Sequence, residues 1–528
     1  MARPENTPHR RPLPALLRSR GAAVAGALAL GLAVSACGSS DKSSAGGGSG
    51  ERAMTMVAVS DSKSLDPFRT LYLAVTDEPR MSALYDPMFY FDPADGKVKP
   101  HLAESLTTAD GGATWTLKLR PGVTFSDGTP FDAAAVKLNW ETHAKPETRS
   151  YLAAYATGLK TEVVDPLTLT VTPTSPNPTF DRMIATKLTY IEAPSAITKG
   201  LESAGTQPVG AGPFMLKSWT RGSEQVFVKN PNYWQKDKGL PKLDKLTVKV
   251  VADLAQEYNT VKSGGADIYH SSDPGYLTKA KQELNANEMT ALGGQGVLFN
   301  LTKAPFEDPR ARRALTLAMD PEEFPKTLNN GMHPTRSIFS ASPFFDPSAQ
   351  QPAPNRDEAQ KLFDELAAEG KKVDFTFLVA STPQSNKVAE YLQSRVQGFK
   401  NVTMRVESLE INTFTMKYAM QHDFQAAQVQ QWYAEPEPDL TSNFLSTGLL
   451  NAGGWKSPDA DKALAAGRAS ADPAVRKAAY ADFQKAMANE LPFAVYSTSV
   501  VGPIYSKKVT GVQTYNVGVV FMDRIGVG

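Results

Sequence analysis

The chain has 528 residues, of which 41% are hydrophobic and 21% are charged, and its formal net charge at pH 7 is +1. This balance gives no basic footprint for nucleic acid, and the length allows about three domain-sized units that each bury a core. The single cysteine, Cys37, excludes an internal disulfide and a cysteine-based zinc site.

The first 36 residues are organised like a secretory signal peptide. Five arginines precede an apolar run of 14 residues from Gly21 to Val34, which is too short to cross the roughly 30 Å hydrocarbon core as a helix. The run ends in Val34-Ser35-Ala36-Cys37, which resembles the bacterial lipobox, in which the cysteine is diacylated and becomes the mature N-terminus. We therefore predict a lipoprotein signal peptide over 1–36 and lipidation at Cys37.

A flexible tether is predicted over residues 37–52, because a segment rich in serine and glycine cannot bury a core. Removal of the signal peptide takes away five arginines and one glutamate and leaves a formal charge of −3. No later apolar run is long enough to cross a bilayer. The body of the protein is therefore expected outside the cell, anchored to the outer face of the membrane by its lipid.

The first half of the body has mainly strand patterns. Thr114 to Arg120 alternates apolar and polar residues, and Val163-Val164 and Leu167 to Val171 flank an Asp-Pro turn. Leu246 to Val250 alternates in the same way. These patterns predict strands, with a β-rich part near residues 90–205.

The second half has more helical patterns. Asp308-Pro309 and Asp472-Pro473 each supply a helix cap and a first-turn proline. The second helix is expected to bury one face, formed by Val475, Ala479, Phe483, Ala486 and Met487. A strand over 375–379, a helix over 386–397 and a strand over 402–406 predict a parallel or mixed sheet covered by helices. The fold class is therefore α/β.

Catalytic chemistry has little support in this sequence. The histidines stand singly, Gly210-Ala211-Gly212 lacks the third glycine of a dinucleotide loop, and no phosphate-binding loop or nucleophile elbow is found. Carboxylate pairs such as Glu322-Glu323 are neighbours in sequence and point apart on a helix. We expect no enzyme, no cofactor and no metal site.

One segment has a highly specific resemblance. Leu119 to Val136 reads LRPGVTFSDGTPFDAAAV, and it is similar to the signature of the peptide/nickel (family 5) solute-binding proteins of ABC importers. Further similar segments extend over most of the mature chain: Leu84–Met88, His101–Ser105, Pro208–Phe214, Asn230–Trp234, Gly264–Ile268, Phe299-Asn300 and Pro305–Leu315.

The resemblance implies a periplasmic-binding-protein-like fold of class II, with two lobes that close over a ligand at a hinge and an extra β-rich subdomain. We assign lobe I to residues 53–90, 206–292 and 495–528, the subdomain to 91–205 and lobe II to 293–494.

The resemblance also implies a ligand site. Peptide-binding members have a Trp-x-Ala-Asp strand whose aspartate pairs with the ligand's α-ammonium, and Trp432-Tyr433-Ala434-Glu435, preceded by Gln431, is similar to it. Glu435 falls on the anchor position, and the strand could pair with an extended peptide. The alternatives are core packing for the aromatic pair and an exposed proline-rich turn for Glu435. Further candidates for ligand contacts are Arg336, Phe299, Asn300 and Phe68.

These observations predict a monomeric, lipid-anchored extracytoplasmic receptor that presents a peptide or peptide-like solute to the permease subunits of an ABC importer. Within the class, an oligosaccharide, a metal chelate or an opine-like compound is the alternative ligand. A surface lipoprotein with a hydrolase or protein-holding role is the alternative from another class.

Overall fold

The computed structural model describes residues 51–328 and 330–528. The predicted signal peptide, Cys37 and the predicted tether up to residue 50 lie outside the described residues. Within the described ranges, none of the helices combines the length and apolar character that a bilayer crossing requires. We keep the names lobe I, subdomain and lobe II for the residue ranges given above.

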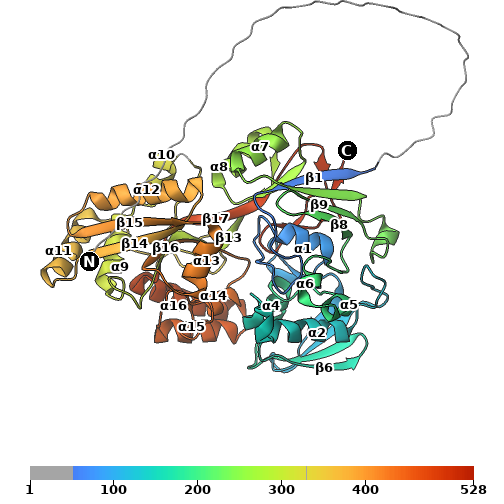
Figure 1. Cartoon of the computed structure of the whole chain (residues 1–528). Coiled ribbons are helices and arrows are strands. Elements are labelled where there is room, and N and C mark those ends of the chain that lie inside the picture. Colours follow the sequence, from blue (N-terminus) through green and yellow to red (C-terminus); the bar gives the residue numbers. More distant parts are fainter. Residues whose placement is uncertain (1–50, 329) are drawn as a thin grey trace, which may run out of the picture. The chain divides into compact units, whose positions relative to one another are not determined.

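The largest element of the fold is an 11-stranded mixed sheet that runs through both lobes (Figure 1). Its strands are β1 (Ala53–Ala58), β8 (Phe214–Thr220), β9 (Glu224–Lys229), β10 (Lys245–Val250), β11 (Ile268–Ser271), β12 (Asn285–Ala286), β13 (Met289–Phe299), β14 (Val373–Ala380), β15 (Val402–Leu409), β16 (Ala426–Tyr433) and β17 (Phe493–Tyr505). Their order is β15-β14-β16-β13-β17-β11-β1-β10-β9-β8, and β12 pairs with β17.

The long strands β13 and β17 connect the two lobes. They pair with each other in antiparallel register; β13 also pairs with β16 of lobe II, and β17 pairs with β11 of lobe I. The register of β13 shifts between Ala291 and Gln295, where Gly293 and Gly294 have φ values of +119° and +145°. Such values favour glycine, so the strand changes direction where the predicted boundary between lobes lies.

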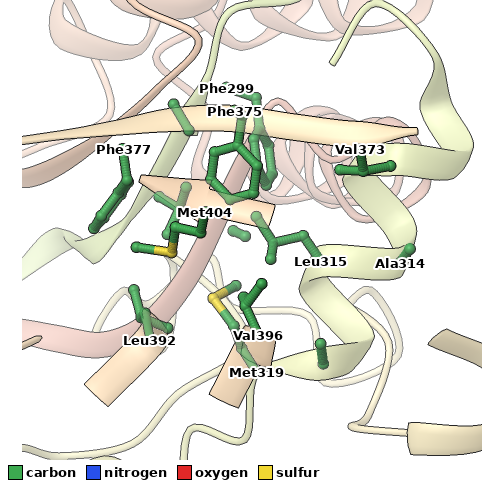
Figure 2. Packing of buried hydrophobic residues seen from close by; sticks show 14 of the residues in the cluster. Phe299, Ala314, Leu315, Met319, Val373, Phe375, Phe377, Leu392, Val396 and Met404 are labelled. Atoms are coloured by element: carbon green, nitrogen blue, oxygen red, sulfur yellow. The ribbon is translucent and has the colours of Figure 1, made fainter. Parts of the chain in front are cut away.

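Lobe II contains the predicted strand, helix, strand unit. Strands β14 and β15 are parallel, and α12 (Pro383–Gln397) connects them. Figure 2 shows side chains of β14, β15 and their covering helices in one cluster, including Phe375, Met404 and Val396. The other helices of this lobe are α9 (Pro309–Ala318), α10 (Glu323–Leu328), α11 (Arg356–Ala368), α13 (Ile411–Thr415), the π-helical turn η3 (Met416–Met420), α14 (Asp439–Phe444), α15 (Pro458–Arg468) and α16 (Pro473–Glu490).

Both predicted Asp-Pro helix starts are confirmed. A carboxylate oxygen of Asp308 accepts from the Arg310 amide at 2.9 Å, and one of Asp472 accepts from the Ala474 amide at 2.7 Å. The predicted buried face of α16 is wrong at one position. Val475 is 48% exposed, whereas Arg476 is 2% exposed, so an arginine occupies the interior where an aliphatic side chain was expected.

The subdomain has its own core around Trp115, Leu117 and Val171. The predicted strands are confirmed as members of an antiparallel sheet in the order β4-β5-β7-β6, beside a β2-β3 hairpin. The helices, which the sequence patterns did not show, also pack here. The elements are β2 (Phe89–Asp92), β3 (Lys97–Pro100), β4 (Ala103–Thr107), β5 (Trp115–Leu119), β6 (Lys160–Asp165), β7 (Thr168–Thr172), α2 (Ala133–Ala144), η1 (Pro146–Thr148), α3 (Ala153–Ala156), α4 (Phe180–Thr186), α5 (Pro194–Thr198) and α6 (Leu201–Ala204).

Lobe I packs apolar side chains on both faces of its part of the sheet. Met56 and Val248 face one cluster, and Val57 and Tyr269 face the other. The remaining elements of this lobe are α1 (Glu78–Leu84), η2 (Lys236–Lys238), α7 (Leu254–Lys262), α8 (Pro274–Glu283), β18 (Val509–Thr510) paired with β21 (Gly526–Val527), and β19 (Thr514–Tyr515) paired with β20 (Val519–Val520).

Candidate functional site

The end of β16 holds the predicted ligand-contacting residues. Its residues from Ala426 to Tyr433 pair with β13 on one side. On the other side, β14 pairs only with Ala426 and Ala427. Within the described chain, the segment from Gln428 to Tyr433 therefore has a sheet partner on one edge only, and no strand pairs with its other edge.

Five successive polar positions on this strand bury side-chain atoms without a hydrogen-bond partner in the described chain. They comprise donor atoms and acceptor atoms, all on uncharged side chains: Gln428 Oε1, Gln430 Nε2, Gln431 Oε1, Trp432 Nε1 and Tyr433 OH. A buried polar atom left unpaired costs about 1–3 kcal/mol. Because successive side chains of a strand point to opposite faces of the sheet, Gln428, Gln430 and Trp432 lie on one face and Gln431 and Tyr433 on the other.

Glu435 is buried two residues beyond β16 and has charged partners from two parts of the chain. Arg476 on α16 donates to its Oε1, and Nε of Arg182 on α4 lies 3.2 Å from the same oxygen. Burial raises the pKa of the Glu435 carboxyl, although both arginines act to lower it. The proline-rich segment after β16 is thus no exposed turn at this position.

A second ion pair involves Asp439, four residues after Glu435 in the chain. Nζ of Lys187, which follows α4, is 2.7 Å from Oδ1 of Asp439, the first residue of α14. The ammonium also lies 5.7 Å from the centre of the Tyr155 ring. Arg182 and Lys187 belong to the subdomain, and Glu435 and Asp439 belong to lobe II. Two cations of the subdomain therefore contact two carboxylates of lobe II.

Lobe I adds an acidic side chain near this junction. The Tyr190 hydroxyl donates to Glu78 Oε2 at 3.0 Å and lies 2.9 Å from the Tyr515 hydroxyl. Burial raises the pKa of the Glu78 carboxyl to about 7, while Tyr190 and the charge of Lys187 act to lower it. Lys187 therefore experiences carboxylates of both lobes.

Phe299 and Asn300 are brought into the interior of lobe II. The Phe299 ring is fully buried, 4.6 Å from that of Phe306, and offers no surface to a ligand here. The Asn300 amide donates to the carbonyls of His422 and Phe424, each at 3.0 Å. Its hydrogen bonds hold the loop before β16.

Phe68 and Arg336 also lie away from the β16 segment. Phe68 is fully buried, with its ring centre 4.8 Å from that of His143. Nη1 of Arg336 donates to the Gln351 carbonyl at 2.9 Å. Neither residue contacts Glu435 in the structure. The predicted ligand-contacting residues therefore form one group at the end of β16, and the other predicted residues lie apart from it.

Sequence reasoning missed the ion pairs at and near Glu435, which involve Arg182, Lys187, Asp439 and Arg476. A buried arginine at the second turn of α16 has no local signature, because the neighbouring Val475 fits the apolar pattern better. Within the described residues, no group of three or more histidine, aspartate or glutamate side chains is arranged to hold a metal ion.

The fold and site together define a two-lobed binding protein of the periplasmic type. Residues 97–451 match the middle region of the bacterial extracellular solute-binding proteins, family 5. The chain therefore belongs to this family of extracellular solute-binding proteins, as the signature from Leu119 to Val136 indicated.

Comparison with individual proteins agrees with this membership. A glutathione-binding protein, GsiB, of Salmonella paratyphi A is 34% identical over 283 residues, which cover 52% of this chain and 54% of the relative. The chain spans about half the length of the curated relatives it matches.

Solved structures share the fold. The murein tripeptide binding protein MppA of Escherichia coli has a TM-score of 0.79 at 21% identity, over 90% of this chain and 98% of that one. NikZ of Campylobacter jejuni, solved in complex with Ni(L-His), has a TM-score of 0.73 at 20% identity, over 90% and 99%. At this identity the likeness concerns the fold alone.

Proposed function

We propose that this protein captures a peptide or peptide-like solute between its lobes and delivers it to the permease of an ABC importer. A lipid on Cys37 would hold it at the outer face of the membrane. Family membership supports the receptor role. The glutathione-binding relative and the murein tripeptide binding neighbour support a peptide-like ligand.

The observation that carries the peptide proposal is the free edge of β16 between Gln428 and Tyr433. An extended peptide added to this edge would use main-chain hydrogen bonds, which depend little on ligand sequence. The unpaired side-chain atoms of Gln430 and Trp432 would then find partners in ligand amides. Uncharged donors and acceptors suit amide groups better than isolated charges.

The amine-anchoring role of Glu435 stays a prediction. Its carboxylate already contacts two guanidinium groups, those of Arg476 and Arg182. A ligand ammonium would have to share the carboxylate with them, and like charges in a buried site repel strongly. Recognition through the peptide main chain needs no such sharing.

Closure follows from the same contacts. We infer that the contacts of Arg182 and Lys187 with the carboxylates of lobe II form when the lobes close over the solute and separate when they open. In the proposed cycle the protein captures and releases the solute without making or breaking a covalent bond in it.

The test is calorimetric titration of the mature protein with a tripeptide, its N-acetylated form and a neutral trisaccharide. We expect both peptides to bind and the sugar to fail. Gln430→Ala should weaken the peptides about threefold to tenfold, whereas Gln397→Ala, at an exposed position of α12, should not. Binding of the sugar alone would overturn the peptide proposal.

Glu435→Gln separates the two modes of peptide recognition. If Glu435 pairs with the ligand amine in a buried site, the variant should lose about 2–5 kcal/mol with the free peptide and much less with the acetylated one. If main-chain recognition dominates, the two peptides should respond equally.

A further inference from the structure

A cavity of about 470 Å³ opens between the subdomain and lobe I, away from the site at β16. Its lining comes from the α5–α6 segment, the residues that follow it, and β8 with its turn, and none of the lining residues belongs to lobe II. The volume falls in the range of small-molecule sites. The cavity is therefore separate from the interlobal site and large enough for a ligand.

Three cations and no carboxylate line this cavity. Lys199, Lys217 and Arg221 contribute the charges, and in the part of the chain that the structure describes, neither lysine has an ion-pair partner. Two carboxylates close to the cavity have partners of their own, and the charge of Arg221 also acts on Glu202. Asp61 accepts from the Trp219 indole at 3.0 Å and from the Gly222 amide at 2.9 Å, and Glu202 lies 2.6 Å from Arg69.

One wall of the cavity is held in place by its own contacts. The Arg221 guanidinium lies 3.4 Å from the centre of the Trp219 ring and donates to the carbonyls of Ser62 and Lys63 at 3.0 and 3.2 Å. The bond from the indole to Asp61 fixes the ring from its other end. A planar cation on a fixed aromatic ring forms a rigid platform before any ligand arrives.

Small hydrogen-bonding groups complete the lining of the cavity. Ser203, Thr206 and Gln207 follow one another along the end of α6 and the next loop, and Ser218 lies on β8. Hydroxyl and amide groups beside unpaired ammonium groups are the partners that phosphate and carboxylate oxygens accept from. Val209 and Leu216 add an apolar surface.

We propose that this cavity is a second binding site, for a small anion that carries a phosphate or carboxylate beside a planar or apolar part. The anionic group would lie among Lys199, Lys217 and Arg221, and the planar part would lie against the Trp219 platform. Because no residue of lobe II takes part, an anion bound here can remain when the lobes open.

Calorimetry with phenyl phosphate, and with benzyl alcohol as a neutral match, tests the proposal on the mature protein. We expect saturable binding of phenyl phosphate only. The double variant Lys199→Ala/Lys217→Ala should weaken it at least tenfold, and Trp219→Leu should weaken phenyl phosphate more than inorganic phosphate. The matched control is Lys145→Ala/Lys456→Ala, which removes two exposed lysines away from the cavity.

Two results would overturn the proposal. One is no binding of phenyl phosphate at millimolar concentration, and the other is binding that the cavity variants leave unchanged, which would show adventitious anion binding only. Circular dichroism and urea unfolding identify a variant that has failed to fold. Arg221→Lys then serves as a second, milder variant, since it keeps the charge and loses the planar stack.

The phosphate group could belong to a soluble metabolite or to a lipid headgroup. Flotation with phosphatidylglycerol vesicles that depends on Lys199 and Lys217, but not with phosphatidylcholine vesicles, assigns the site to a headgroup. Phenyl phosphate binding without flotation assigns it to a soluble anion. Either supports the site, and neither depends on whether the interlobal solute is a peptide.

Discussion

Lys187 and Asp439 join the subdomain to lobe II through a 2.7 Å contact between Nζ and Oδ1. The side chains are 21% and 7% exposed, so water screens them only in part. Arg182 and Glu435 form a parallel contact at 3.2 Å. The subdomain thus supplies the cations that hold lobe II in the observed arrangement.

We predict that Lys187→Met weakens solute binding about tenfold or more. The variant leaves the Asp439 carboxylate buried without its cation in the closed arrangement, and breaking a buried pair from one side costs up to about 3–5 kcal/mol. The open arrangement returns the carboxylate to water, so the closed population and the apparent affinity fall together. Calorimetry and small-angle scattering, with and without solute, measure both quantities.

The double variant Lys187→Met/Asp439→Asn is the control for this effect. It removes both charges, so most of the lost affinity should return. A double variant as weak as the single one would show that the lysine acts on the solute directly.

We predict that Arg476→Met destabilises the folded protein by about 3 kcal/mol at pH 7, because Glu435 keeps its burial and loses its closest cation. Val475→Ala, at the exposed neighbouring position, should change stability by less than about 0.5 kcal/mol. Urea unfolding of both variants measures the difference. Equal stabilities would mean that Glu435 gains its support from Arg182 alone.

The sequence predicted those parts of the fold that depend on local signals. Asp308 and Asp472 cap helices because their carboxylates accept from amides of the first turn, and the proline that follows each of them suits the first helical position. The strands β5, β7 and β10 follow alternation of period two. The short helices α3 to α6 were missed, because segments of four to seven residues carry too few apolar positions to show a helical period.

The candidate site could be predicted only where its residues are continuous in sequence. Gln431 to Glu435 are neighbours in the chain, so one motif located them. Arg182 and Arg476 lie far from Glu435 in sequence, and only the tertiary fold brings them to it. Phe299 and Asn300 show the converse, since a family motif at these positions reflects packing and loop geometry in lobe II.

We predict that Glu257→Gln stabilises the protein at pH 8. Both Glu257 carboxylate oxygens are buried without a partner in the described chain, and burial raises the pKa of the carboxyl to about 8, with the charge of Asp253 adding to the shift. The folded state therefore holds this proton more tightly than the unfolded state, whose pKa is about 4.3. Stability from this group is intact below about pH 4 and is lost as the pH rises through about 8.

The glutamine variant lacks this ionisation and should be more stable than the parent by roughly 2 kcal/mol at pH 8, with a smaller difference at pH 5. Urea unfolding at the two pH values measures it. Glu390→Gln, at an exposed position of α12, should keep the parent's pH dependence. A Glu257→Gln profile parallel to the parent's would show that this carboxyl titrates normally.

We predict that Gly294→Ala damages the connection between the lobes. A Cβ atom at this position would lie 2.5 Å from Cγ2 of Val495 and 2.9 Å from the Ser497 carbonyl oxygen of β17, and its φ of +145° is unfavourable for alanine. The strand pair cannot yield easily, because β13 and β17 are held to each other on both sides of the bend. Stability should fall by about 2–4 kcal/mol, and solute binding should weaken with it.

Gly96→Ala is the control that separates backbone strain from a steric clash of the Cβ atom. Gly96 has a φ of +68° with nothing within 4 Å of its Cβ position, so this variant should cost only about 1 kcal/mol. Urea unfolding of the two variants makes the comparison, and equal losses would mean that β17 moves aside and that the bend in β13 tolerates a side chain.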